Sequence, residues 1–105
     1  MFSPLHCVRI AHMSTRLRRA LVAAVEKEKG ERWSAFRDRY GDWGRDVALM
    51  LGRLECGLKL GELGELCGGM DYRSVGTAVM KMRKRVREDE EAKGIYERIR
   101  ETLQS

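Results

Sequence analysis

From residue 58 to residue 86 the chain reads LKLGELGELCGGMDYRSVGTAVMKMRKRV, a pattern typical of two helices joined by a glycine turn. Gly68 and Gly69 can adopt the positive φ that ends a helix, and Asp71 can cap the helix that follows. Two helices joined by so short a turn meet at an angle. We therefore expect a helix-turn-helix over about residues 59–87.

The second helix of this motif, expected over about residues 71–87, has an apolar face and a basic face. Its apolar positions recur at steps of three and four and are Val75, Val79, Met82 and Val86. The opposite positions are Arg73, Thr77, Met80, Lys84 and Arg87. Between Arg73 and Arg87 every charged residue is positive. We expect the apolar face to pack and the basic face to point outward.

A recognition helix needs short polar side chains near its N-terminus to reach base edges and cations further along to meet phosphates. The expected partner is therefore double-stranded DNA, with the helix in the major groove. The candidate base contacts are Tyr72, Arg73, Ser74 and Thr77, and the candidate phosphate contacts are Arg45, Lys81, Lys84 and Arg85. Arg73 is the best candidate for guanine, which arginine binds with two hydrogen bonds. The alternative is that the basic face is only solvated surface.

Three segments resemble the C-terminal DNA-binding domain of the chromosomal replication initiator DnaA. They read RDVALML from Arg45, LGELG from Leu60 and GGMDYRSV from Gly68. That domain belongs to the Trp-repressor-like helix-turn-helix group. The resemblance, which covers about residues 42–103, implies the same all-α fold and makes Tyr72, Arg73 and Ser74 contacts to bases or phosphates.

The segment after the paired glycine departs from the initiator family, which has Arg-Asp-His-Thr-Thr-Val there. Met70 and Tyr72 replace two donors that the family uses to read its origin boxes, so we expect a different target sequence. The loop and the spacing to the last helix are more similar to the initiator-like domain at the C-terminus of transposases that mobilise repeated extragenic palindromes. Their catalytic domain uses a His-hydrophobic-His pair, a pattern that His6 and His12 do not form.

The rest of the chain predicts four more helical segments and a single domain over residues 14–105, preceded by a flexible segment over residues 1–13. A first helix, capped by Ser14 or Thr15 and ended by Gly30, has its apolar stripe at Leu17, Leu21, Ala24 and Val25. A second, ended by Gly41, places Trp33, Phe36 and Tyr40 in the core. A central helix capped by Asp42 packs through Val47, Met50, Leu51 and Leu54, and a final helix packs through Ala92, Ile95, Ile99 and Leu103. With the motif, this makes an all-α fold of five to six helices.

Four further predictions concern packing and charge around the motif. Gly64 should lie where the first helix of the motif crosses the second, while Gly61 should be more exposed and Glu62 and Glu65 should face solvent. Cys67 should be a small packed side chain. Three arginines in the first helix offer either an auxiliary phosphate clamp or a solvated helix start; they are Arg16, Arg18 and Arg19.

Composition limits the classes of function. The 105 residues carry a net charge of +5, which favours an anionic partner. The three cysteines, Cys7, Cys56 and Cys67, show no C-x-x-C spacing, so we expect no disulfide framework and no metal site. No stretch approaches the roughly 20 apolar residues of a membrane span, and we expect a cytoplasmic protein without a membrane partner.

The chain shows no nucleophile with a base partner and no phosphate-binding glycine loop, so we expect a binding protein without a cofactor and not an enzyme. A protein-interaction or regulatory module that keeps the fold without reading sequence remains the alternative. The final helix leaves the oligomeric state open between a monomer and a homodimer.

Overall fold

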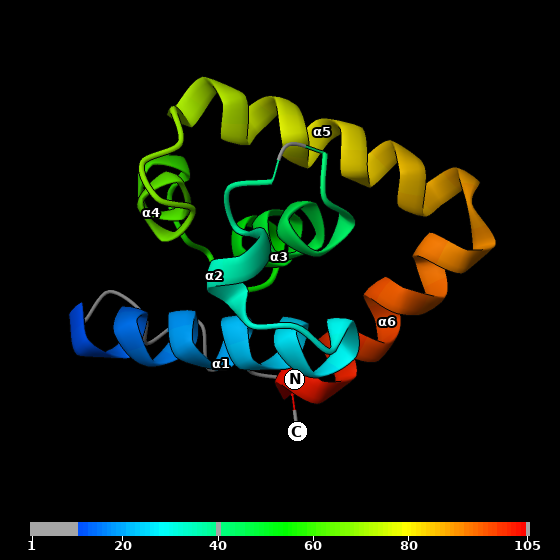
Figure 1. The fold of residues 1–105 in the computed structure, drawn as a ribbon, viewed down its shortest axis with the longest axis horizontal. Helices are drawn as coiled ribbons and strands as arrows, with labels where there is room; N and C mark the ends of the chain where they lie inside the picture. The colour runs from blue at the N-terminus through cyan, green and yellow to red at the C-terminus, as the bar shows by residue number, and fades with distance from the viewer. Residues whose placement is uncertain (1–10, 40, 105) are drawn as a thin grey trace.

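The computed structural model describes residues 11–39 and 41–104, and every regular element within them is a helix. These elements, shown in Figure 1, are α1 (Ala11–Lys29), α2 (Trp33–Phe36), α3 (Trp43–Leu54), α4 (Leu60–Leu66), α5 (Tyr72–Glu88) and α6 (Glu90–Gln104). The predicted all-α fold of five to six helices is confirmed for the described part of the chain.

Helix α3 lies at the centre, and α1, α4 and α5 pack around it (Figure 1). Nearly its whole circumference is buried, including Val47, Met50 and Leu51, as predicted. The predicted core position of Leu54 is wrong, since its side chain is 43% exposed. Leu54 is the last residue of α3, where the helix leaves the core. Ala48 and Leu49 fill the opposite side of the helix instead.

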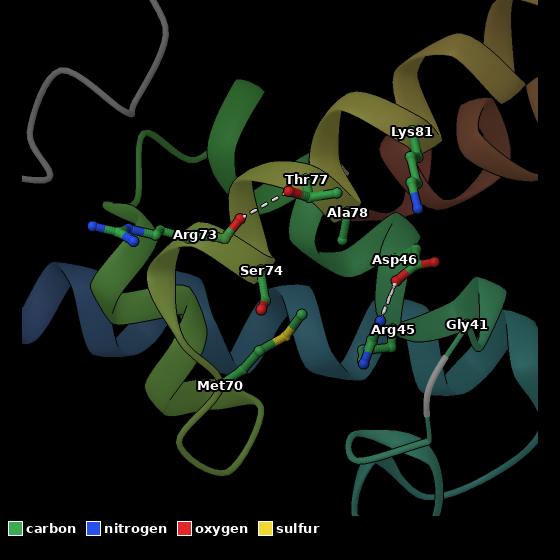
Figure 2. A pocket seen from close by; sticks show the side chains of 9 residues that line it. All are labelled: Gly41, Arg45, Asp46, Met70, Arg73, Ser74, Thr77, Ala78 and Lys81. Carbon is green, nitrogen blue, oxygen red and sulfur yellow. Dashed lines mark hydrogen bonds and ion pairs between the residues drawn. The ribbon is translucent and has the colours of Figure 1, made fainter.

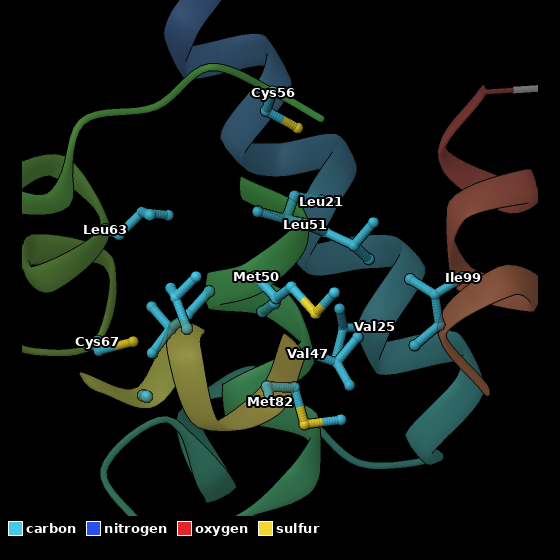
Figure 3. Close-up of a cluster of buried hydrophobic side chains, with 14 of the residues drawn as sticks. Leu21, Val25, Val47, Met50, Leu51, Cys56, Leu63, Cys67, Met82 and Ile99 are labelled. Carbon is cyan, nitrogen blue, oxygen red and sulfur yellow. The ribbon is translucent and has the colours of Figure 1, made fainter. Parts of the chain in front are cut away.

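The core joins side chains from all the longer helices (Figure 3). Leu21 and Val25 of α1 meet Met50 and Leu51 of α3, and the cluster extends to Leu63, Met82 and Ile99 from the three C-terminal helices. Helix α6 packs on α1 and α5, and Ala92 and Ile99 are buried there. The prediction that the last helix closes the core of its own domain is therefore confirmed.

Helix α1 begins at Ala11, three residues before the earlier of the two predicted caps. Nothing in Ala11-His12-Met13 interrupts a helix, so the regular structure extends past Ser14. Gly30, with φ of +74°, ends α1 as predicted. Residues 1–10, most of the predicted flexible segment, lie outside the described residues.

Helix α2 is a single turn and ends at Phe36, so the predicted helix up to Gly41 is too long. The chain closes into a turn there, in which the backbone N–H of Arg39 donates to the Phe36 carbonyl at 3.0 Å. Trp33 and Phe36 are buried as predicted, and the Trp33 indole N–H donates to the Leu66 carbonyl at 2.9 Å. Tyr40 lies outside the described residues.

A buried lysine fixes the end of α1 against the start of α3. The Lys29 ammonium lies 3.1 Å from the carboxylate of Asp42 and over the rings of Phe36 and Trp43, at 5.1 and 4.7 Å from their centroids. Asp42 also caps α3, accepting hydrogen bonds from the backbone N–H groups of Gly44 and Arg45. This arrangement ties the last turn of α1 to the first turn of α3.

Candidate nucleic-acid interface

Two consecutive glycines with positive φ join α4 to α5. Gly68 and Gly69 have φ of +80° and +98°, and the N–H groups of Gly69 and Met70 both donate to the Gly64 carbonyl at 2.9 Å. Asp71 caps α5, accepting from the backbone N–H of Arg73 at 3.1 Å. The glycine turn and the aspartate cap are both as predicted from the sequence.

Gly64 permits this turn to fold back onto α4. A Cβ atom built at Gly64 would overlap the Met70 carbonyl oxygen and would lie 3.7 Å from Cγ2 of Val75. Gly61 is exposed, and nothing lies within 4 Å of a Cβ built there. The contrast predicted between the two glycines is confirmed, and the closest neighbour of Gly64 is the turn backbone rather than a side chain of α5.

Glu65 is exposed as predicted, whereas Glu62, also predicted to face solvent, is half-buried. The Glu62 carboxylate accepts from the Lys59 backbone N–H at 2.8 Å and pairs with Arg18 at 3.0 Å. The bond from the Lys59 backbone is the main cause that lowers the pKa of Glu62. Arg18 therefore ties α1 to α4, whereas Arg16 and Arg19 are exposed.

Helix α5 has the two predicted faces. Val75, Val79 and Met82 are buried against the core and Val86 is half-buried. The opposite positions, Arg73, Thr77, Met80, Lys84 and Arg87, are all exposed, and Met80 is 72% exposed. The exposed face runs along one edge of the molecule (Figure 1).

Most cations on α5 are available to an external anion. Among the described residues no ion pair involves Arg73, Lys81, Arg83, Lys84 or Arg87. Arg85 approaches Asp89 only at 3.8 Å, and the Arg73 guanidinium lies 5.9 Å from the centroid of the neighbouring Tyr72 ring. By contrast, Lys29 and Arg98 are held in close pairs within the fold.

A pocket of about 540 Å³ lies between the first turns of α3 and the N-terminal half of α5 (Figure 2). Its walls are Gly41, Arg45, Asp46, Met70, Arg73, Ser74, Thr77, Ala78 and Lys81. The fold thus brings together five of the residues predicted from sequence to contact DNA, namely Arg45, Arg73, Ser74, Thr77 and Lys81. Tyr72, Lys84 and Arg85 lie outside this pocket.

Arg45 is not a free cation, because Asp46 holds it. The Nε and Nη2 atoms of Arg45 donate to Oδ1 of Asp46 at 3.1 and 3.0 Å, and the Arg45 side chain is 8% exposed. Burial raises the pKa of the Asp46 carboxyl, while the hydrogen bond and charge of Arg45 oppose that shift. Sequence reasoning missed Asp46, although its position beside Arg45 in the first turn of a helix was a visible signal.

Cys67, at the start of the turn, is buried as predicted, and burial raises the pKa of its thiol to about 11. Among the described residues no three His, Cys, Asp or Glu side chains are grouped to hold a metal ion. None of the described helices has the length and apolar character needed to cross a membrane.

No protein-family model, curated protein or solved structure matches the chain.

Proposed function

We propose that this protein binds double-stranded DNA without enzymatic activity, through a helix-turn-helix formed by α4 and α5. The observation that carries the proposal is the exposed basic face of α5, most of whose cations have no ion-pair partner among the described residues, Arg85 with Asp89 being the exception. An α-helix with its side chains is about 10–12 Å wide, which fits the major groove of about 12 Å. The face is long enough to contact both base edges and the flanking phosphates.

In this proposal the N-terminal turns of α5 contact bases and the later turns contact phosphates. Tyr72, Arg73, Ser74 and Thr77 lie in its first turns, where a recognition helix contacts base edges. Lys81, Lys84 and Arg85 follow one to three turns later and are placed for phosphates on the groove walls. The resemblance to the replication initiator and to the transposase-associated domain supports this division and suggests a stand-alone relative of such domains.

The experiment is selection of bound duplexes from a random-sequence pool at near-physiological salt, with the wild type and with Arg73→Ala. We expect a recovered motif that degrades in the variant, because Arg73 is assigned to a base. Lys93→Ala, which removes one exposed charge from α6, is the matched control and should leave the motif intact. Recovery of the same motif with Arg73→Ala would remove that residue from base recognition.

A second candidate, a protein-interaction module, is favoured by two exposed apolar side chains on α5. Tyr72 is 54% and Met80 is 72% exposed, in or beside the basic face. If selection recovers no motif and the residual affinity disappears with added salt, DNA binding is only electrostatic. The search would then turn to an acidic protein partner that covers Tyr72 and Met80.

A further inference from the structure

The pocket between α3 and α5 contains a carboxylate where the proposed DNA backbone would enter. Asp46 is the one acidic side chain among the described residues that line the pocket, and it faces cations from both helices. Lys81 points toward Asp46 from α5, whereas the Arg73 side chain, which also lines the pocket, is directed away from that pair (Figure 2). A carboxylate in this position repels phosphate and so opposes the attraction of its neighbours.

Asp46 also pairs with Arg45, the cation of α3 that lines the pocket and could otherwise contact a phosphate. Arg45 lines the pocket, but two of its donors are directed at Asp46, and no other side chain among the described residues pairs with it. An arginine held by a carboxylate cannot use the same donors for a phosphate. The two residues are adjacent in sequence and both lie in the first turn of α3.

The pair joins a partly exposed Asp46 side chain to a buried Arg45 guanidinium. Its carboxylate is 20% exposed, and the charged groups around it are Arg45 and Asp42 on the α3 side and Arg85 and Lys81 on α5. Burial raises the pKa of the Asp46 carboxyl, and the hydrogen bond and charge of Arg45 offset only part of that shift. Neutralising Asp46 would therefore release Arg45 without leaving an unpaired buried carboxylate.

We propose that Asp46 restrains DNA binding by holding the Arg45 guanidinium away from a phosphate that enters the pocket between α3 and α5. This inference rests on the proposed function. It makes Asp46 a residue that sets affinity through Arg45, and it makes Arg45 a phosphate contact only when the pair is open.

The test compares affinities for a random-sequence duplex pool, by fluorescence anisotropy over a range of salt concentrations. Asp46→Asn should bind about three- to tenfold more tightly at low salt, and its plot of log K against log salt should steepen by about 0.9, the value for one added phosphate contact. Adding Arg45→Gln to Asp46→Asn should abolish both gains. Thermal melting of each variant establishes that it is folded.

Glu97→Gln is the matched control, because it makes the same change in net charge on an exposed residue of α6. If Glu97→Gln tightens binding as much as Asp46→Asn, the effect is one of net charge and the restraint is overturned. Weaker binding by Asp46→Asn would also overturn it, since Asp46 would then position Arg45 for contact. If the Asn variant is unstable, Asp46→Ser provides the same comparison.

The two proposals fail differently. Wild-type binding with a motif, combined with no change in Asp46→Asn, overturns the restraint alone. No binding of any duplex by the wild type or by any variant overturns the proposed function and the restraint with it.

Discussion

Arg73 and Lys84 lie on the same face of α5, yet the proposed function gives them different tasks. Arg73 is in the first turn of the helix, beside Tyr72 and the pocket, whereas Lys84 is about three turns further along. Direct reading of a base requires a side chain near the groove floor, while a phosphate contact requires only a cation near the groove wall. Both are exposed and neither is paired among the described residues.

We therefore predict unequal effects of removing these two side chains. Arg73→Ala should lose about 1–3 kcal/mol of discrimination at one base position. Lys84→Ala should weaken binding to all sequences alike and reduce the salt slope by about 0.9. Titration of a selected duplex and of single-base variants measures both. Equal loss of sequence preference in the two variants would contradict this division.

The two glycines of α4 provide a second pair with opposite expectations. Gly64→Ala should destabilise the fold by roughly 1–3 kcal/mol or more, because the added methyl group meets the Met70 backbone, which cannot move aside without displacing the turn. Gly61→Ala should stabilise it by roughly 0.5–1 kcal/mol, because the position is open and alanine favours a helix. Denaturant unfolding of the two variants measures the difference. Equal effects would mean that the turn is not packed on α4.

At the scale of the elements, the sequence predicted the helix boundaries at Gly30, Asp42 and Asp71 and missed the start of α1 and the end of α2. Local chemistry determines an end: Gly30, Asp42 and Asp71 act within one turn of their own positions. The outcome for Glu62 depended in part on a neighbour distant in sequence, whereas the outcome for Leu54 followed from its place at the end of a helix. Leu54 projects from the end of α3, and Glu62 meets Arg18 of α1.

The candidate site shows the same limit. The exposed face of α5 follows from helical periodicity alone, so it was predictable. That Arg45 would share a pocket with Arg73 and Lys81 depends on how α3 crosses α5. No periodic pattern contains that crossing, which follows from the packing of the whole core.

Substitution of Lys29 tests the contact between the end of α1 and the start of α3. Lys29→Met should destabilise the protein by about 3 kcal/mol, because it removes one partner of a buried ion pair. Asp42 would then keep Arg39 as its remaining cationic partner. Lys27→Met, on the exposed side of the same helix, should change stability by no more than about 0.5 kcal/mol. Chemical denaturation of both variants gives the comparison. A negligible effect at Lys29 would show that the α1–α3 contact is held by apolar packing alone.

At the scale of the whole molecule, the buried thiols make stability depend on pH. Burial raises the pKa of Cys56 and of Cys67 from 9.0 to about 11, so the unfolded chain loses these protons at a lower pH than the folded one. Their contribution is fully present below pH 9 and is lost as the pH rises toward about 11. At about pH 11, ionisation of each thiol should have lowered the free energy of unfolding by about 2–3 kcal/mol.

The expected result is a steeper fall in unfolding free energy between these pH values for the wild type than for Cys56→Ala. Comparing slopes, rather than absolute stabilities, removes the effect of the smaller side chain and of other groups that titrate in that range. Identical slopes would mean that the Cys56 thiol ionises equally easily in both states.

The hydrogen bond between the Trp33 indole and the Leu66 carbonyl makes this residue a natural optical probe. It joins α2 to the last residue of α4, so the indole is shielded from water only while those two helices remain docked. In a Trp43→Phe background, Trp33 would be the sole tryptophan emitter. A red shift of its fluorescence that precedes the loss of helical circular dichroism would reveal detachment of α4 as a separate event, visible without any label.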